Sequence, residues 1–436
     1  MRLALCPVTA VTCDASFRVL EDAAIHVENN RISYVGPMKS QPPFEADETI
    51  GGEHFIALPG LVNAHTHAAM TLLRGYADDM ALETWLQTRI WPFESHLQAD
   101  DVYWGTMLAA VEMLQGGTTC CADMYHFYHD GVRAFIESGM RAVPGGVLLG
   151  FLPEASRRIA NAISFVLEYS NAGEGRITPA LAPHSLYTCN ADHWRAMVDG
   201  AHKIGCLLHT HASETQREIA DVQAQWGASP IRALKNIGAL EGPLQAAHCV
   251  HVDENDLDIL QESGARVAHN PTSNLKLASG FAPVEKFLSR GIVTSLGTDG
   301  AASNNDLDMW EEMRLAALLH KATTGDATAV SAQQALMMAT QNGACSLNLG
   351  DQIGSLEAGK KADIILMDFD KPHLTPRHNV VSHLVYAAKA SDVDMVLVDG
   401  RVLVRGGRCT QMDVAQIGAQ AKSRASRLVQ TAQQVR

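Results

Sequence analysis

The chain has 436 residues, of which 47% are hydrophobic and 19% charged, and its formal net charge is −14. A chain of this composition can bury a large core, and its length allows one large α/β domain beside a smaller one. Because the charge is acidic and no long basic cluster occurs, we expect no surface that attracts a nucleic-acid backbone. A small neutral or cationic substrate fits this charge better.

The nine cysteines lie mostly in apolar stretches and lack the short spacings of a secreted disulfide framework. Free thiols in a cytoplasmic protein are the simpler interpretation. The N-terminal segment MRLALCPVTAVTC resembles a signal peptide only faintly, because Pro7 breaks its apolar stretch and a hairpin-like segment follows. No apolar run reaches the roughly 18 residues of a membrane-spanning helix, so we expect no membrane insertion.

Residues 1–57 contain short β-branched or alternating runs, including 23–27 and 31–35, separated by the turn residues ENN. This pattern is typical of strands. Similar runs return at 362–368 and 393–407, the second with Asp399-Gly400 at a hairpin turn. Strands at both ends of the chain predict a small, discontinuous β-sandwich.

Between these flanks, eight short apolar strands alternate with segments of helical periodicity such as 100–115 and 331–347. The strand candidates are GLVNAHTH, GTTCCADM, RAVPGGVLLG, ITPALAPH, CLLHTHASE, LQAAHCVH, ARVAHNPTSN and IVTSLGTDG. This alternation predicts an α/β fold, a (β/α)₈ barrel of the TIM type. We therefore expect residues 58–352 to form the barrel. Residues 1–57 and 353–436 would then form the sandwich, followed by an amphipathic C-terminal helix.

Six polar residues stand at the carboxyl ends of predicted barrel strands, where barrel enzymes build their active sites. They are His65, His67, His211, Glu214, His248 and Asp299. His65 and His67 share one side of a strand because side chains alternate with a period of two. Imidazoles together with a carboxylate such as Asp299 suit zinc or a similar divalent cation. An isolated HxH pair is a weak signal, but its combination with later strand ends predicts a metal site.

Several segments together resemble the amidohydrolase superfamily, and more closely its 5′-methylthioadenosine/S-adenosylhomocysteine deaminase branch. They are PGLVNAHTHAAMTLLRG, HASE, AAHCVHVDENDL, VAHNPTSNLKLASG and LGTDGAASNNDLDMWEEMR. The resemblance covers nearly the whole chain and implies that one metal ion is bound by His65, His67, His211 and Asp299. Zinc is usual in these deaminases, while Fe²⁺ and Mn²⁺ suit similar ligands. The predicted fourth strand ends in LAPHSLYT without a lysine, so we expect a single ion.

The resemblance also implies the catalytic roles. A divalent cation lowers the pKa of bound water toward ~7. Glu214, three residues after His211, transfers a proton from water to the ring nitrogen. His248 polarises the nucleophile and stabilises the oxyanion, and Asp299 assists the later proton transfer. His209 shares a strand face with His211, but the spacing of HASE favours His211 as the ligand and His209 as a packing residue.

Three further residues are implied to contact a nucleoside. Glu94 would hold the ribose hydroxyls, since one carboxylate can accept from two neighbouring hydroxyls. Trp85 would cover the base or thioether, and His184 would contact the purine ring. Each also has a plainer interpretation as a packed helix-face or strand-end residue. His269 and Cys249 are expected to be structural.

One departure from the family concerns S-adenosylhomocysteine. Relatives that accept it carry two arginines for the amino-acid carboxylate. Here Gly145-Gly146 occupies the region of the first arginine, while Arg157 and Arg158 are candidates for the second. An uncompensated carboxylate in a partly dry pocket is costly, so we expect a preference for 5′-methylthioadenosine, together with adenosine.

Two other interpretations stay open. Related metal barrels hydrolyse guanine, cytosine, triazine or imidazolone rings. The residues of the first strand and Asp299 do not indicate which of these substrates a given member of the superfamily uses. In a different class, amidohydrolase-like chains that have lost ligands serve as scaffolds, but the full ligand set argues against this. The resemblance implies a homo-oligomer with a small-molecule partner. The cysteines, the charge and the apolar pattern described above predict a cytoplasmic protein with no nucleic-acid or membrane partner.

Overall fold

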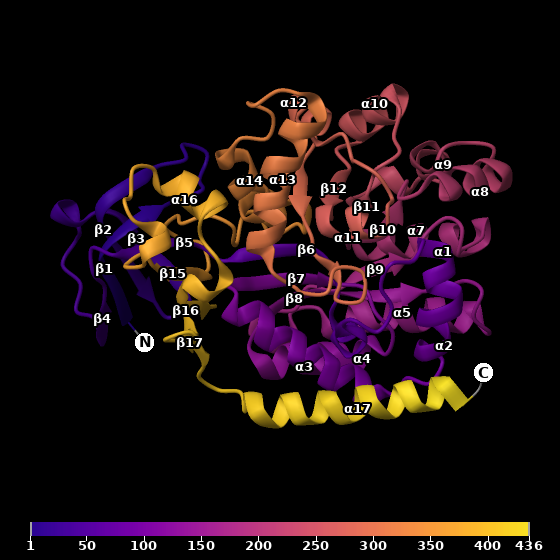
Figure 1. Ribbon diagram of the computed structural model, residues 1–436, viewed down its shortest axis with the longest axis horizontal. Helices are drawn as coiled ribbons and strands as arrows, with labels where there is room; N and C mark the ends of the chain where they lie inside the picture. The colour runs from indigo at the N-terminus through magenta and orange to yellow at the C-terminus, as the bar shows by residue number, and fades with distance from the viewer. Residues whose placement is uncertain (1, 435–436) are drawn as a thin grey trace. The chain divides into compact units, whose positions relative to one another are not determined.

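The computed structural model describes residues 2–434, which form two sheets of nine strands each (Figure 1). The first sheet has the order β18-β17-β16-β15-β5-β1-β2-β3, with β4 paired to β1. Its strands come from both ends of the chain, as predicted. They are β1 (Arg2–Val11), β2 (Val19–Glu28), β3 (Arg31–Pro37), β4 (Glu48–Ile50), β5 (Phe55–Pro59), β15 (Ile364–Asp368), β16 (Val393–Val398), β17 (Arg401–Arg405) and β18 (Arg408–Cys409).

The antiparallel pairing of β5 with β15 joins the two ends of the chain within this sheet. Alternating side chains of the strands form one apolar cluster that includes Leu5, Ile25, Ile364 and Leu366, all with no exposed surface. The predicted hairpin at 393–407 is formed by β16 and β17. Burial of these alternating β-branched and leucine side chains holds the discontinuous segments together.

The second sheet is the predicted barrel, in the order β13-β12-β11-β10-β9-β8-β7-β6-β14. Its strands are β6 (Leu61–His67), β7 (Thr118–Asp123), β8 (Arg141–Leu148), β9 (Ala180–Pro183), β10 (Leu208–Ala212), β11 (Leu244–His248), β12 (Arg266–His269), β13 (Thr294–Leu296) and β14 (Asp299–Gly300). Each of the eight predicted strand segments contains one of these strands, with β13 and β14 as two parts of the eighth. β13 pairs with β12 and β14 pairs with β6, both in parallel, so the barrel is closed.

The closure of the barrel depends on Gly297, between β13 and β14. A Cβ atom at this position would lie 2.7 Å from the carbonyl oxygen of His65 and 2.8 Å from its nitrogen. Only glycine therefore lets the last strand approach the first so closely. The resulting register pairs Asp299 with Thr66 and Gly300 with His67. It thereby brings the predicted site residues of the first and the eighth barrel strand together.

Helices follow most barrel strands, and their ends have the expected local signals. Side chains at the N-caps of α7 (Ala191–Ile204), α8 (Gln216–Trp226), α10 (Glu254–Ser263), α13 (Met309–Thr324) and α14 (Ala332–Ala339) accept a backbone N–H of the first turn. The first four of these helices end at a glycine with left-handed backbone. Other helices of the chain are α3 (Ala99–Gln115), α4 (Tyr128–Ser138), α5 (Ala155–Tyr169), α6 (Ala172–Gly175), α9 (Pro230–Asn236), α11 (Pro271–Lys276), α12 (Val284–Ser289), α15 (Gln341–Ser346) and α16 (Val380–Tyr386).

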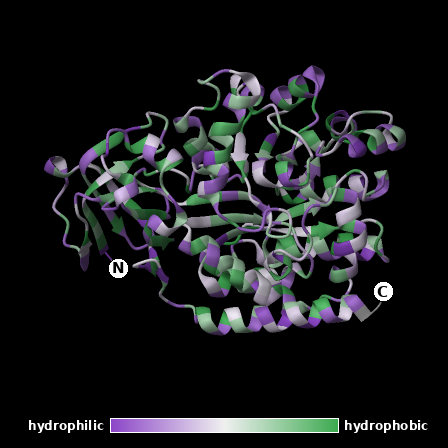
Figure 2. Cartoon of the chain, in the orientation of Figure 1, coloured by the Kyte–Doolittle hydropathy of each residue, from purple (hydrophilic) through white to green (hydrophobic). Residues whose placement is uncertain are grey.

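A helical excursion follows β6 and is covered by the C-terminal helix. The excursion comprises η2 (Ala68–Leu73), α1 (Leu82–Trp85), η3 (Leu86–Ile90) and α2 (Trp91–Glu94). Helix α17 (Val414–Gln434) contacts η2 and α2, and its Ala421 and Leu428 share an apolar cluster with Phe93. Hydrophobic and hydrophilic residues alternate along α17, as in an amphipathic helix (Figure 2). On its polar side, Arg427 donates to the buried carboxylate of Asp101.

The chain divides into two compact units. One comprises the residues up to Asn63 with Val111–Cys120 and Asp308–Met412, and the other comprises Ala64–Ala110, Cys121–Leu307 and the residues from Asp413 onward. The domain limits at residues 57 and 352 stay a prediction. Within the part of the chain described, no helix combines the length and apolar character needed to cross a membrane.

We expect Leu366→Ala to lower the free energy of unfolding by about 2 to 5 kcal/mol, because the substitution leaves a cavity in the fully buried cluster between the chain ends. Thermal and denaturant unfolding monitored by circular dichroism measure this effect. Leu318→Ala is the matched control, since 46% of Leu318 is exposed. An equal loss in both variants would contradict the assignment of this core.

Candidate active site

The ends of β6, β10, β11 and β14 bring five predicted residues to one point. One ligand atom each of His65, His211, His248 and Asp299 lies within 4.8 Å of the others, and all four residues are buried. The Nε2 atom of His67 lies 3.1 Å from Asp299 Oδ1 and 3.3 Å from His211 Nε2. The site is therefore built by tertiary contacts between residues up to 234 positions apart in the chain, as the pair from His65 to Asp299 illustrates.

Backbone carbonyls determine which ring nitrogen of two histidines carries the proton. His67 donates its Nδ1–H to the carbonyl of Met124 at 2.5 Å, and His211 donates its Nδ1–H to the carbonyl of His184 at 2.8 Å. The Nε2 atom of each ring is then left with a lone pair that points into the site. Two lone pairs that face each other beside a carboxylate repel, and a cation between them turns this repulsion into coordination.

His65 completes the inner side of the site. Its Nδ1 atom lies 2.9 Å from Nε2 of His209, so His209 lies directly behind His65. Its buried Nε2 atom has no hydrogen-bond partner and lies 3.4 Å from Asp299 Oδ1. A buried nitrogen without a hydrogen bond is costly, and a metal ion satisfies such an atom.

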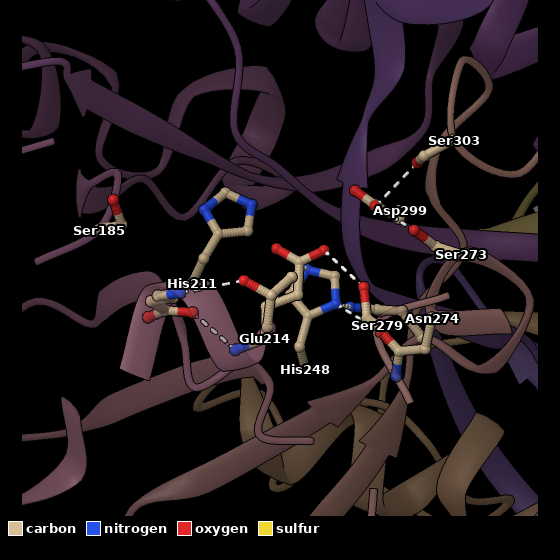
Figure 3. A network of polar contacts seen from close by, with 12 residues as sticks. Ser185, His211, Glu214, His248, Ser273, Asn274, Ser279, Asp299 and Ser303 are labelled. Carbon is tan, nitrogen blue, oxygen red and sulfur yellow. Dashed lines mark hydrogen bonds and ion pairs between the residues drawn. The ribbon is translucent and has the colours of Figure 1, made fainter. Parts of the chain in front are cut away.

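The carboxylate of Asp299 is oriented by two serines. Its Oδ2 atom accepts hydrogen bonds from Ser273 at 2.6 Å and from Ser303 at 2.8 Å (Figure 3). The Oδ1 atom is consequently directed at the histidines. Burial by itself would raise the pKa of Asp299, but the imidazoles of His65 and His67 beside it hold that pKa well below its usual value. Burial and the neighbouring imidazoles lower the pKa of His211, so both residues have the protonation state that metal ligands need.

These observations define a divalent-metal site. Imidazole nitrogens and a carboxylate oxygen are the donor set of zinc and of related transition metals. The unpartnered nitrogen of His65 and the facing nitrogens of His67 and His211 fit such an ion.

Glu214 and His248 lie beside this site and contact each other (Figure 3). Glu214 Oε2 is 3.8 Å from His248 Nε2, while Glu214 Oε1 accepts a hydrogen bond from Ser279 at 3.4 Å. His248 Nδ1 lies 2.8 Å from Asn274 Oδ1, so this nitrogen carries a proton and Nε2 faces the cavity. Burial raises the pKa of Glu214, which brings the carboxyl group closer to proton exchange at neutral pH.

The backbone is strained where the strands deliver these residues. Ser213, His248 and Asp299 have φ angles of 58°, 75° and 59°, in the left-handed region that residues with a Cβ atom rarely occupy. Each such conformation costs on the order of 1–3 kcal/mol and persists only where surrounding contacts enforce it. Their clustering at the strand ends is typical of a functional site.

Three of the five residues predicted to contact the substrate line a cavity that His67, His211 and Asp299 also line. Trp85, Glu94 and His184 all line it, together with an apolar wall that comprises Leu82, Leu86, Ile90, Val147, Leu149 and Leu277. Glu94 Oε2 lies 3.6 Å from Nε2 of His126, a neighbour that the sequence analysis missed. Burial lowers the pKa of His184 to about 3, so its ring is neutral. The indole N–H of Trp85 donates to the carbonyl of Ala77.

Arg157 and Arg158 lie away from this cavity on the surface of α5. Arg157 donates to Glu154 at 3.0 Å and Arg158 donates to the carbonyl of Pro153 at 2.9 Å. No arginine or lysine is found among the described residues that line the cavity. A Cβ atom at Gly145 would lie 2.7 Å from that of Ala182, so this position has no room for a long side chain. The contribution of the two arginines to substrate binding stays a prediction.

Sequence reasoning missed the residues that orient the predicted ones, namely Ser273, Asn274, Ser279, Ser303 and His126. Asn274 and Ser273 follow β12 directly, within the segment NPTSN, and Ser303 lies four residues after Asp299. The sequence signal that could have identified them is their position shortly after barrel strands, where active sites of barrel enzymes are built. His269 is the last residue of β12. Cys249 is fully buried, and this burial raises the pKa of the Cys249 thiol.

A closed parallel barrel with this donor set at its carboxyl end defines a class of metal-dependent hydrolases. Residues 56–403 match the Amidohydrolase family. A 5-methylthioadenosine/S-adenosylhomocysteine deaminase from Pelotomaculum thermopropionicum is 47% identical over 422 residues, which cover 97% of each chain.

Two solved structures are similar over nearly the full length. An adenosine deaminase from Xanthomonas campestris with bound zinc has a TM-score of 0.95 and 37% identity, covering 98% of each chain. Atrazine chlorohydrolase from Arthrobacter aurescens, in complex with zinc, has a TM-score of 0.89 and 25% identity, covering 97% of this chain and 100% of that one. The present chain belongs to the amidohydrolase family and, within it, to the 5-methylthioadenosine/S-adenosylhomocysteine deaminases.

We expect Ser273→Ala and Ser303→Ala each to weaken metal binding by about 10- to 100-fold, because each removes a hydrogen bond that orients Asp299. Competition with a chelator of known affinity measures the change. Ser289→Ala, at an exposed position of α12, serves as the control. Unchanged affinity in both site variants would show that the orientation of Asp299 does not depend on these hydroxyls.

Proposed function

We propose that this protein is a metal-dependent deaminase of adenine nucleosides that converts 5′-methylthioadenosine to its inosine analogue and ammonia. The observation that carries the proposal is a cavity lined by the metal site, by the buried pair of Glu214 and His248, and by apolar side chains. The names of the similar deaminases support the same activity. Adenosine is the second substrate of the proposal, with S-adenosylhomocysteine a poorer one, in a role in purine salvage.

Zinc is the proposed ion, with Fe²⁺ or Mn²⁺ as alternatives of similar ligand preference. His65, His67, His211 and Asp299 would hold it, and the bound zinc of two similar structures supports this choice. When bound, a divalent cation supplies Lewis acidity and lowers the pKa of water to about 7.

The proton transfers are assigned to the residues of the chain. Hydrolysis forms a bond from a water oxygen to the ring carbon and breaks the bond from that carbon to the exocyclic nitrogen. Glu214 accepts a proton from the attacking water and gives it to the ring nitrogen beside the reacting carbon. With a proton on each ring nitrogen, His248 would donate through Nε2 to the developing oxyanion. Asp299 assists the last proton transfer, after which the exocyclic nitrogen leaves as ammonia.

The cavity supports a nucleoside with an apolar 5′ substituent. We assign Glu94 to the ribose hydroxyls, His184 to the purine ring and Trp85 to the cover of the base. Val147 and Leu149 line the same cavity and suit a thiomethyl group. A substrate carboxylate would meet no lysine or arginine among the described lining residues, so its desolvation would be uncompensated.

We further infer that the protein works in the cytoplasm as a homo-oligomer, without a nucleic-acid partner. Its acidic charge and the lack of a membrane-crossing helix in the described residues agree with this setting. The second candidate activity is hydrolysis of another substituted heterocycle, which the similarity to the atrazine enzyme favours. A scaffold role without catalysis would require that the purified protein hold no stoichiometric metal.

We expect 5′-methylthioadenosine to be turned over with a kcat/KM at least about 10-fold above that of S-adenosylhomocysteine, because the latter carries an unpaired carboxylate. Loss of adenine absorbance on zinc-loaded enzyme measures both, and release of ammonia measures adenosine, guanine, cytosine and an amino-substituted triazine in the same panel. Equal turnover of S-adenosylhomocysteine would contradict the preference. If the enzyme turned over a triazine or guanine alone, the proposed nucleoside deaminase activity would be wrong and hydrolysis of that ring would take its place.

We expect Glu214→Gln to lower kcat by about 10²- to 10⁴-fold, because a buried amide cannot relay the proton. Metal content should stay at the wild-type level, since Glu214 is outside the proposed ligand set. Steady-state kinetics and elemental analysis measure the two quantities. Glu262→Gln, at an exposed position, controls for loss of a carboxylate. Full activity of Glu214→Gln would remove this residue from the mechanism.

A further inference from the structure

The turn between β10 and α8 carries Glu214, and a second buried glutamate reaches back to this turn. Glu218 is the third residue of α8, and only 4% of its surface is exposed. None of the proposed chemical steps uses it. Asp221, one turn further along the same helix, instead pairs with Arg217 at the surface.

The carboxylate of Glu218 binds the two residues that precede the helix cap. Its Oε1 atom accepts the backbone N–H of Ser213 at 3.0 Å, and its Oε2 atom accepts the backbone N–H of Glu214 at 2.6 Å. The hydroxyl of Thr215, the N-cap, accepts the N–H of Glu218 in return. In an ordinary capping box the glutamate would bind the N–H of the N-cap itself. Here it reaches one and two residues further back and thereby clamps the turn.

This clamp acts where the backbone is strained. Ser213 has a φ angle of 58°, which a serine adopts at a cost unless contacts hold it there. Hydrogen bonds from backbone N–H groups to a carboxylate are among the stronger ones in proteins, and the N-terminus of a helix favours a negative charge. The Ser213 carbonyl also accepts the N–H of His251 at 2.8 Å. Removal of the two Glu218 bonds would therefore release the N–H side of the turn and let Ser213 relax toward extended backbone. Such a change would rotate Glu214, the next residue, away from His248.

We propose that Glu218 is a positioning residue that holds the turn of Ser213 and Glu214 so that the Glu214 carboxyl group faces the reacting atoms. The inference rests on the proposed function, because it takes Glu214 as the proton-transfer group. Glu218 acts through the backbone of this turn and does not touch the substrate or the metal ligands.

Glu218→Gln tests the proposal with little change in volume. The amide oxygen can accept one backbone N–H, but the amide NH₂ group must face the other. We expect kcat for 5′-methylthioadenosine to fall about 10- to 100-fold, as a small displacement of a catalytic group does, with KM and metal content unchanged. Asp221→Asn, on the same helix, should keep the wild-type kcat.

A double variant distinguishes positioning from a general loss of structure. If Glu218 acts only through Glu214, adding Glu218→Gln to Glu214→Gln should cause no further loss of kcat. Amide hydrogen exchange of residues 213–215 gives a second measure, and it should be faster in Glu218→Gln than in wild type.

Wild-type kcat in Glu218→Gln would overturn the proposal, as would a further loss in the double variant or unchanged exchange of the turn. Because the exchange measurement needs no substrate, it also decides whether the clamp exists if the wild type fails to deaminate nucleosides. That failure would concern the proposed function alone.

Discussion

The site depends on the convergence of imidazole nitrogens and a carboxylate oxygen at one point. The carbonyls of Met124 and His184 take the Nδ1 protons of His67 and His211 and leave their Nε2 lone pairs facing each other at 3.3 Å. A carboxylate oxygen of Asp299 joins them. A cation at this point would be bound by these groups together, and its binding would stabilise the folded protein.

The barrel makes this convergence possible because its strands end at one rim. Gly297 lets the eighth strand reach the first, and the register then sets Asp299 beside Thr66 and His67. Ser213, His248 and Asp299 have left-handed backbone at this rim, and His248 and Asp299 line the cavity. Around them, Ser273, Asn274 and Glu218 bind the functional groups or their backbone. The geometry of the site is therefore enforced by polar contacts from separate loops.

The excursion after β6 forms one side of the cavity, and the C-terminal helix packs on that excursion. Trp85 and Glu94 reach the cavity from short helices, on the excursion that α17 contacts through Ala421 and Leu428. Among the described residues that line the cavity, many are apolar, and the charged ones other than histidines are acidic. This combination selects against an anionic substituent through the cost of desolvation.

The sequence by itself determined the strand pattern of the barrel, the sandwich strands at both ends, and the polar residues after the strands. These follow from local rules, since alternation, helical spacing and strand-end position are properties of short segments. Only the tertiary structure decided that Ser273 and Ser303 orient Asp299, and that Arg157 and Arg158 lie outside the cavity. TQRE, residues 215–218, has the pattern of a capping box, yet the glutamate binds the preceding turn. Such contacts depend on how loops pack in three dimensions, and that packing is not encoded in any single segment of the chain.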